Sequence, residues 1–396
     1  MADKLIAPLL LDVSRLVWRA WRGRLPTGID RTCLAYVAHY QNRAVAVIQR
    51  GSVTRLLSPS TSRQLFDVLL QGANVRSRLL KLIPASLMDI TRSSTLAGCH
   101  YLNVGHTGLE KVGHSQWIER TGVKPIYFVH DLIPLVHPEY CRPEEPEKHQ
   151  RRMTALLTHA AGVIANSCDT LNELAVFAAR QRSLQMPSAL AAPLGVTIVS
   201  DRRSEVPLGL LRGGPYFLMV GTVEGRKNHL LILNVWVELA RRLGAACPKL
   251  VIIGQRGWEC EQAVDMLERC EAIRGHVIEL SRCDDVQLIG YLRGARALLF
   301  PSFAEGYGLP LVEALSHGTP VIASDLPVFR ELAGVIPDYL SPIDGLGWAS
   351  MIENYTRDDS PMRHSQYERM ANWAPPSWQN HFAQVDRWLG RFNFTP

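Results

Sequence analysis

The feature that most restricts the fold of this chain is a repeated alternation between short apolar runs and longer segments with helical spacing. Such alternation is typical of β-α-β units and predicts parallel sheets covered by helices. In the first half, strands are expected at 9–13, 44–49, 100–104, 125–129 and 162–165. Helices are expected between them, near 31–40, 62–70, 109–120, 145–158 and 170–180. The sequence therefore predicts an α/β fold.

The same pattern starts again after residues 190–214, a stretch rich in proline and glycine that reads as an interdomain linker. Beyond it, strands are expected at 216–220, 250–253, 286–288, 297–300 and 320–323, and helices at 229–243, 261–273 and 310–317. A last helical pattern lies in 376–392. A chain of 396 residues has room for two such domains.

Composition excludes several classes of protein. Hydrophobic residues make up 47% and charged residues 20%, which is ordinary for a folded globular chain. No apolar run has the length of a transmembrane helix, and the apolar N-terminal stretch contains Pro8 and Asp12, unlike a secretory signal. The eight cysteines form no CxxC pair, so we expect reduced thiols and no zinc site. A diffuse net charge of +6 does not indicate a nucleic-acid partner.

Two local clusters of cations lie beside apolar side chains. The first comprises Arg15, Arg19, Arg22 and Arg24 with Trp18 and Trp21, and the second comprises Arg76, Arg78 and Lys81 among leucines 79, 80 and 82. Such surfaces suit an anionic bilayer. The alternative is a solvated loop and an ordinary amphipathic helix.

The segment "FPSFAEGYGLPLVEAL" at 300–315 carries the strongest chemical signal. A buried strand ends at Phe300, a glycine-bearing loop with Glu305 follows, and a helix starts at Pro310. This order places free backbone N–H groups and the positive end of a helix at one point, which suits a diphosphate. Glu313 lies about one turn into the helix, and carboxylates accept hydrogen bonds from sugar hydroxyls. Because Glu313 is a charged residue in an otherwise apolar helix, we favour a bound ligand or a charged partner at Glu313 over a solvent-exposed position on the helix surface.

The segment "VGTVEGRKN" at 220–228 presents Arg226 and Lys227 after a strand. Two adjacent cations at the mouth of a parallel sheet suit a pyrophosphate leaving group. The alternative is a solvated basic turn capped by Asn228.

Two loops of the first half are further candidates. In "YFVHDLIP" at 127–134, His130 follows a strand at the end where parallel sheets bind ligands, and histidine can hydrogen-bond a sugar hydroxyl near neutral pH. A structural histidine that caps the strand is the alternative. In "LPTGIDR" at 25–31, Gly28 permits close approach of the backbone to a ligand, or forms a plain tight turn.

Together these four segments resemble the retaining glycosyltransferases of family four, which have the GT-B fold. "GTVEGRKN" at 221–228 resembles the donor diphosphate motif of that family, and "PSFAEGYGLPLVEALSHGTPVIASDLPVFRELAG" at 301–334 resembles its paired-glutamate signature. "TGID" at 27–30 and "HDLIPLVHPEY" at 130–140 resemble its acceptor-side loops. The latter is similar to the mannosyltransferase-like branch of polysaccharide enzymes.

The resemblance implies two Rossmann-like domains with parallel sheets that face each other across a cleft. Residues 1–200 would bind the acceptor, 201–375 would bind the nucleotide sugar, and a helix in 376–396 would cross back to complete the first domain.

It also implies roles for the matching residues. Arg226 and Lys227 would hold the donor diphosphate, Glu305 would contact the hexose, and Glu313 would contact the ribose. His130 would lie at the reacting centre and Gly28 beside the donor. The other donor contacts would be Gly221, Thr222, Gly306, Tyr307, Gly308 and Leu309. One departure is the Gly-Ile-Asp-Arg run at 28–31, where many relatives have a second glycine.

These residues predict the reaction class. Fixed cations and the absence of an Asp-x-Asp motif favour metal-independent transfer with no cofactor beyond the nucleotide-sugar donor. No side chain stands out as a nucleophile, and the family implies retention of anomeric configuration. The expected donor is GDP-mannose, with a UDP-hexose next, and the expected acceptor is a glycan or lipid-linked glycan of a cell-surface polysaccharide.

Such an enzyme would be cytoplasmic and peripheral on the inner face of the cell membrane. One alternative is a sugar-nucleotide epimerase of the same fold, which needs an acid–base set that the sequence does not show. Another is a non-catalytic glycosyltransferase-like scaffold subunit, which would be expected to lose at least one of the four charged site residues.

Overall fold

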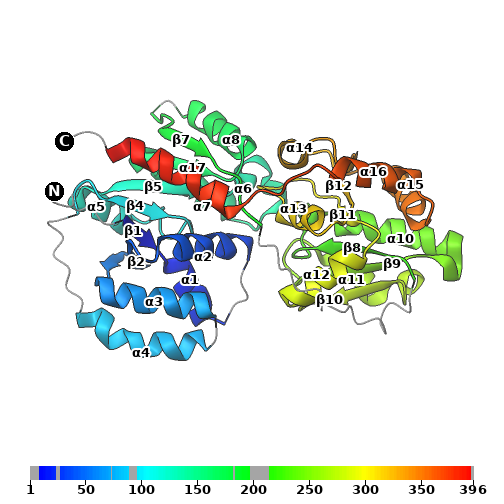
Figure 1. Ribbon diagram of the computed structural model, residues 1–396, viewed down its shortest axis with the longest axis horizontal. Coiled ribbons are helices and arrows are strands. Elements are labelled where there is room, and N and C mark those ends of the chain that lie inside the picture. The colour runs from blue at the N-terminus through cyan, green and yellow to red at the C-terminus, as the bar shows by residue number, and fades with distance from the viewer. Residues whose placement is uncertain are drawn as a thin grey trace. The chain divides into compact units, whose positions relative to one another are not determined.

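A computed structural model describes residues 9–23, 27–72, 74–88, 96–181, 183–196 and 214–393. The chain divides into two compact units, and each contains one sheet (Figure 1). The first unit holds the described residues up to Leu132, then Glu147–Leu194, and then those from Trp378 onward. The second holds Ile133–Pro146 and the described residues from Gly195 to Ser377. Most of the expected linker, 197–213, lies outside the described residues.

The described part of the first unit has a seven-stranded sheet of order β3-β2-β1-β4-β5-β6-β7. Its strands are β1 Leu9–Asp12, β2 Ala44–Arg50, β3 Val53–Leu56, β4 His100–Asn103, β5 Lys124–Val129, β6 Gly162–Ala165 and β7 Ser188–Ala191. All neighbours are parallel except β2 and β3, which form an antiparallel hairpin that the sequence analysis did not predict. Strand β3 lies at the sheet edge with every side chain at least partly exposed, so its apolar pattern is weak.

The helices of the first unit cover this sheet. They are α1 Ser14–Trp21, α2 Gly28–Tyr40, α3 Pro59–Gln71, α4 Val75–Met88, α5 Val112–Thr121, α7 Glu145–His159, α8 Cys168–Ala179 and α17 Trp378–Gly390. Helix α2 buries Cys33, Tyr36, Val37 and Tyr40, a spacing that places all four on one helical face.

The C-terminal helix α17 packs on α2, as Figure 1 shows. The Tyr36 hydroxyl donates to Nε2 of His381 (2.9 Å), and the Tyr40 hydroxyl donates to Asp386 (2.8 Å). The ring of Phe382 stacks on His39 with centroids 4.0 Å apart. The last segment of the chain therefore belongs to the core of the first unit.

The described part of the second unit has a six-stranded parallel sheet of order β10-β9-β8-β11-β12-β13. Its strands are β8 Tyr216–Val220, β9 Lys249–Ile253, β10 Val277–Leu280, β11 Leu298–Phe300, β12 Val321–Ser324 and β13 Asp338–Leu340. Its helices are α6 Ile133–Val136, α10 His229–Leu243, α11 Glu261–Arg269, α12 Asp285–Gly294, α13 Leu309–Ser316, α14 Pro327–Ala333, α15 Gly345–Thr356 and α16 Pro361–Met370. Phe217, Trp236, Leu250 and Trp348 are fully buried in its core.

One predicted strand of this unit is wrong. Residues 286–288 lie inside helix α12, which Asp284 caps by accepting a hydrogen bond from the Gln287 backbone N–H (2.8 Å). The Gln287 side chain accepts from the Asp284 backbone in return, at 3.3 Å. This reciprocal pair is a capping box, and it starts a helix where a three-residue apolar run alone suggests a strand.

Both sheets reverse their order beside their first strand. In the first unit β1 pairs with β2 on one side and β4 on the other, and in the second β8 pairs with β9 and β11. Within each sheet, the loops that follow the two strands at this reversal therefore emerge side by side: those after β1 and β4 in the first unit, and those after β8 and β11 in the second. Open α/β sheets bind ligands at such a point. Among the described residues, no helix has the length and apolar character needed to cross a membrane.

Candidate active site

The loop after β8 is shaped by glycines and by one asparagine. Gly221 has φ +134°, and a Cβ on the neighbouring Gly254 would lie 1.9 Å from the Gly221 oxygen, so both positions require glycine. Asn228 takes the left-handed conformation (φ 59°) just before α10 begins. Its side-chain amide donates to the carbonyl oxygens of Pro301 (3.1 Å) and Pro342 (2.7 Å). Asn228 therefore ties this loop to the loop that follows β11.

The loop after β11 approaches the first loop closely. The backbone N–H of Phe303 donates to the carbonyl oxygen of Arg226 (2.8 Å), and the Arg226 side chain donates back to the carbonyl oxygen of Ala304 (3.0 Å). Gly308 has φ +105°, and a Cβ there would lie 2.7 Å from the Phe329 ring. Helix α13 starts directly after it at Leu309. The sequence order of strand, glycine loop and helix is thus present as expected.

Four charged side chains meet where these loops touch. Glu305 forms ion pairs with Arg226 (Nη1 to Oε2, 3.0 Å) and with Lys227. Arg226 forms a second ion pair with Glu224 (2.7 Å). The Ser302 hydroxyl donates to Glu305 as well (2.7 Å). The Glu305 side chain is 7% exposed, whereas that of Arg226 is 22% exposed. The predicted Arg226, Lys227 and Glu305 therefore form one cluster, in which the arginine retains contact with solvent.

The electrostatics of the cluster follow from its burial. Burial raises the pKa of Glu305, but Lys227 and Arg226 outweigh burial and hold that pKa at about 2. Burial lowers the pKa of Lys227, although Glu305 opposes the shift, and burial raises the pKa of Glu224. Glu305 is thus ionised at physiological pH. The cluster has two acidic and two basic members, so the cations are already held in place before any ligand arrives.

The remaining predicted residues of the second unit lie in the same two loops and in helix α13. Glu313 lies in α13 with 8% exposure, and Leu311, Val312, Ala314 and Leu315 of the same helix are also buried. Tyr307 is buried, and Thr222 and Gly306 are half-buried in the two loops. A carboxylate in so apolar a helix retains the chemistry of a hydroxyl acceptor.

His130 belongs to the first unit, at the end of β5. Its Nε2 donates to the carbonyl oxygen of Val104 (2.7 Å), so Nδ1 is left as the acceptor of a neutral ring. Burial lowers its pKa to about 4. His106 was not predicted, and its ring centroid lies 5.1 Å from that of His130 while its Nε2 donates to Phe128 (2.6 Å). His106 has φ 56° in the β4–α5 loop, and no sequence pattern marks it.

Gly28 is the first residue of α2, and the start of that helix is closed by its own acid. Asp30 accepts from the Thr27 backbone N–H (2.7 Å) and pairs with Arg15 and Arg19 (2.7 Å each). Asp30 is buried. Its carboxylate therefore lies at the positive end of the helix. The sequence analysis placed Asp30 in the "TGID" segment but did not predict its ion pairs with α1.

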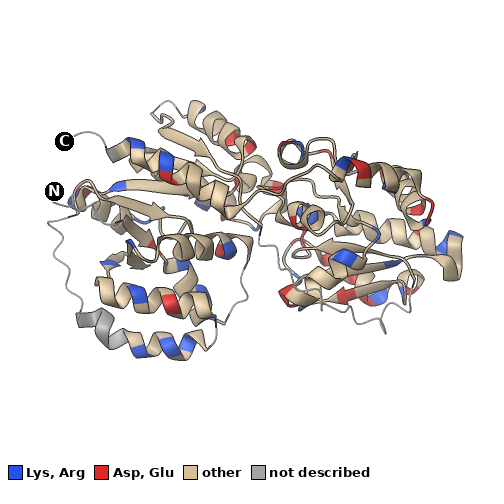
Figure 2. Cartoon of the chain, viewed as in Figure 1, with Lys and Arg blue, Asp and Glu red and all other residues tan. Residues whose placement is uncertain are grey.

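The two basic clusters lie on neighbouring helices. Arg15–Trp21 belongs to α1, so the solvated loop expected as an alternative is wrong there, whereas Arg24 lies outside the described residues. Arg76 of α4 lies over the Trp21 ring at 5.6 Å, which joins the clusters. Figure 2 shows the cations of α4 along that helix.

Comparison with known proteins identifies the class. The fold is similar to Anabaena HepE in complex with UDP-glucose (TM-score 0.65, 15% identity, 97% of this chain and 99% of that one). It is also similar to an α,α-trehalose-phosphate synthase from Burkholderia vietnamiensis (TM-score 0.63, 12% identity, 99% and 100%). The chain has the α/β fold of GT-B proteins, with two Rossmann-like domains.

Proteins with similar sequences include glycosyltransferases of polysaccharide synthesis. Residues 202–334 match the family described as Glycosyl transferases group 1. The Escherichia coli protein "Serotype-specific mannosyltransferase WbdA" is 28% identical over 279 residues, which cover 68% of this chain and 34% of that protein. The "O-antigen chain mannosyltransferase RfbU" of Salmonella typhimurium is 32% identical over 180 residues, covering 44% and 46%. The aligned part of this chain thus spans about a third of WbdA.

Proposed function

We propose that this chain transfers a hexose from a nucleotide sugar to a glycan or lipid-linked acceptor in the synthesis of a cell-surface polysaccharide. The observation that carries the proposal is the buried cluster of Arg226, Lys227 and Glu305 between the loops that follow β8 and β11. Mannosyltransferases among the relatives favour GDP-mannose as donor, with a UDP-hexose next.

Arg226 and Lys227 would bind the donor diphosphate and stabilise the charge that it gains as it leaves. The bond between the sugar C1 and the phosphate oxygen breaks, and a bond from C1 to the acceptor oxygen forms on the same face, with retention. The proton of the acceptor hydroxyl passes to the departing diphosphate. Because two fixed cations meet the diphosphate, the proposed transfer uses no divalent ion or other cofactor.

Glu305 would orient both cations and accept a hydrogen bond from a hexose hydroxyl, and Glu313 would bind the ribose. The free Nδ1 of neutral His130 would accept a hydrogen bond from a hydroxyl at the reacting centre. Gly28 would lie beside the donor, and the backbone of Gly221, Thr222 and 306–309 would contact its phosphates and sugar. The first domain would bind the acceptor, at the inner face of the cell membrane.

A titration of the purified full chain with GDP and with UDP tests the proposal. We expect one nucleotide to bind and the Lys227→Ala variant to bind it at least tenfold more weakly. Transfer from the matching labelled nucleotide sugar to membrane glycolipid should follow. A chain that binds neither nucleotide would instead be a scaffold subunit, and the proposal would be rejected.

A further inference from the structure

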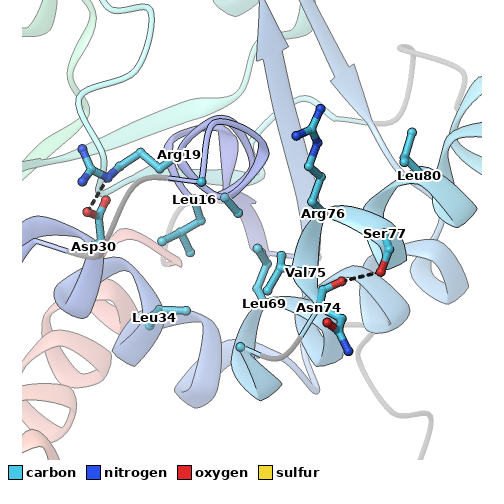
Figure 3. Close-up of a pocket in the computed structure, with 13 residues that line it drawn as sticks. Leu16, Arg19, Asp30, Leu34, Leu69, Asn74, Val75, Arg76, Ser77 and Leu80 are labelled. Carbon is cyan, nitrogen blue, oxygen red and sulfur yellow. Dashed lines mark hydrogen bonds and ion pairs between the residues drawn. The ribbon is translucent and has the colours of Figure 1, made fainter. Parts of the chain in front are cut away.

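Helices α1, α2, α3 and α4 of the first unit line a cavity of about 690 Å³ (Figure 3). Six of the lining side chains are apolar: Leu16, Ala20, Leu34, Leu69, Val75 and Leu80. The volume falls within the range of about 300–1,000 Å³ typical of small-molecule sites, which are mostly apolar with a few polar groups. The proposed transfer reaction makes no use of this cavity.

Charge around the cavity is arranged unequally. On one side Asp30 forms ion pairs with Arg15 and Arg19, so its negative charge is neutralised by residues of the first unit itself. On the other side Arg76 is exposed and lies over the Trp21 ring. Among the residues that the structure describes, no carboxylate forms an ion pair with Arg76 of the cavity lining. This side of the cavity thus carries uncompensated positive charge.

Apolar surface is exposed beside these cations. Leu80 lines the cavity, and half of this residue (50%) is open to solvent. In Figure 3 Leu80 and Arg76 project from the same helix, α4, while Leu16, Leu69 and Val75 lie deeper between the helices. A ligand that covers Leu80 and fills the cavity is stabilised in proportion to the apolar surface that it buries.

We propose that this cavity binds the hydrocarbon chain of an anionic membrane lipid, whose headgroup phosphate pairs with Arg76. The apolar lining selects the chain and the exposed guanidinium of Arg76 selects a negative headgroup. Trp21 supports the arginine by a cation–π contact and adds an amphipathic ring at the level of the headgroup. The lipid site does not depend on the sugar transfer proposed above, although it would hold the enzyme at its membrane.

Binding is measured by calorimetry on the full chain with dioctanoyl phosphatidylglycerol below its micelle concentration. We expect Leu34→Trp, which fills the cavity, and Leu80→Asp, which places a charge at its exposed edge, each to weaken binding at least tenfold. Arg76→Glu should weaken it similarly. Arg63→Glu is the matched control, since Arg63 is an exposed α3 cation outside the lining, and it should bind as the unaltered chain does.

Three outcomes would overturn the lipid site. Equal binding of zwitterionic dioctanoyl phosphatidylcholine would remove the role of Arg76. Equal binding of glycerol 3-phosphate would show a phosphate site without a chain. Unchanged lipid binding in both Leu34→Trp and Leu80→Asp would show attraction to the surface alone. Far-UV circular dichroism and urea unfolding of each variant report its fold. GDP or UDP binding by the unaltered chain separates failure of the lipid site from failure of the proposed transferase.

Discussion

The two sheets reverse their order in the same way, yet the residues gathered at the two reversal points differ in their chemistry. Beside β8 and β11, the second unit gathers two cations and two carboxylates. Beside β1 and β4, the first unit has a buried hydrogen-bond network around the carboxyl group of Asp12, which accepts from Gln49 and Tyr101 (2.7 Å each) while burial raises its pKa. The topology fixes where a ligand binds, and the side chains fix which ligand. A charged site suits a diphosphate, and a polar site suits a hydroxyl-bearing acceptor.

The strongest test of this contrast removes one cation of the second unit. Lys227→Ala should lower kcat/KM for transfer about 10²- to 10³-fold, because an electrostatic contact to the leaving group is lost. The substitution also removes one of the two cations that neutralise the buried charge of Glu305, so the free energy of unfolding should fall. Radiolabelled sugar transfer and urea unfolding measure the two effects. Arg242→Ala, which breaks a surface pair of the same unit, should leave transfer unchanged.

The second test uses acid. His130 has a pKa of about 4 in the fold, below the ordinary 6.5, so between these values the unfolded chain binds more protons. Its contribution is complete above about pH 6.5 and is lost as the pH falls toward 4. His130→Asn should therefore reduce the slope of unfolding free energy against pH by about 1.4 kcal/mol per pH unit within that window.

Glu305→Gln serves as the comparison for acid. Its pKa of about 2 lies below the ordinary 4.5, so its contribution is lost only below about pH 4.5. Urea unfolding between pH 7 and 5 should show the altered slope for His130→Asn and an unaltered slope for Glu305→Gln. The opposite pattern would contradict the assignment of neutral and charged sites.

The third test asks whether neutral His130 acts in transfer. His130→Ala should lower kcat about 10- to 100-fold, the loss expected for one hydrogen bond to a group that gains charge. Nucleotide affinity should stay the same, because the nucleotide is assigned to the second unit. A changed affinity for GDP or UDP with unchanged kcat would reverse the roles of the two units.

The smallest expected effect concerns Tyr140, whose ring stacks on Phe303 (centroids 5.2 Å apart, 8° between planes). Phe303 holds the loop of Glu305 through its bond to Arg226. Tyr140→Ala should raise the KM for donor about 3- to 10-fold, the equivalent of an aromatic pair worth about 0.5–1.5 kcal/mol. Tyr140→Phe keeps the ring and should behave as the unaltered chain. Equal KM values for Tyr140→Ala and Tyr140→Phe would exclude a positioning role.

The charged cluster could be foreseen because each of its loops has a local signature: strand, glycines, charged residues, helix. Contacts between distant segments could not. The pairing of Asp30 with Arg15 and Arg19 depends on how α1 lies against α2, and the approach of His106 to His130 depends on a left-handed residue in a loop. The error at 286–288 has another cause, since a short apolar run fits a strand or a buried helix equally well. There the Asp284–Gln287 capping box was the better guide.

The segment Ile133–Pro146 follows β5 of the first unit, yet it belongs to the second unit, where Arg142 lies over the Trp258 ring at 4.9 Å. With α17 returning to the first unit, the backbone passes between the units four times. A single cut near residue 195 would thus separate Trp258 from Arg142 and Phe303 from Tyr140. It would also remove helix α17 from its packing against α2. Separate expression of either unit, or a chimera with the second unit of a relative, therefore has to include the short segments 133–146 and 378–393 with the unit to which each belongs.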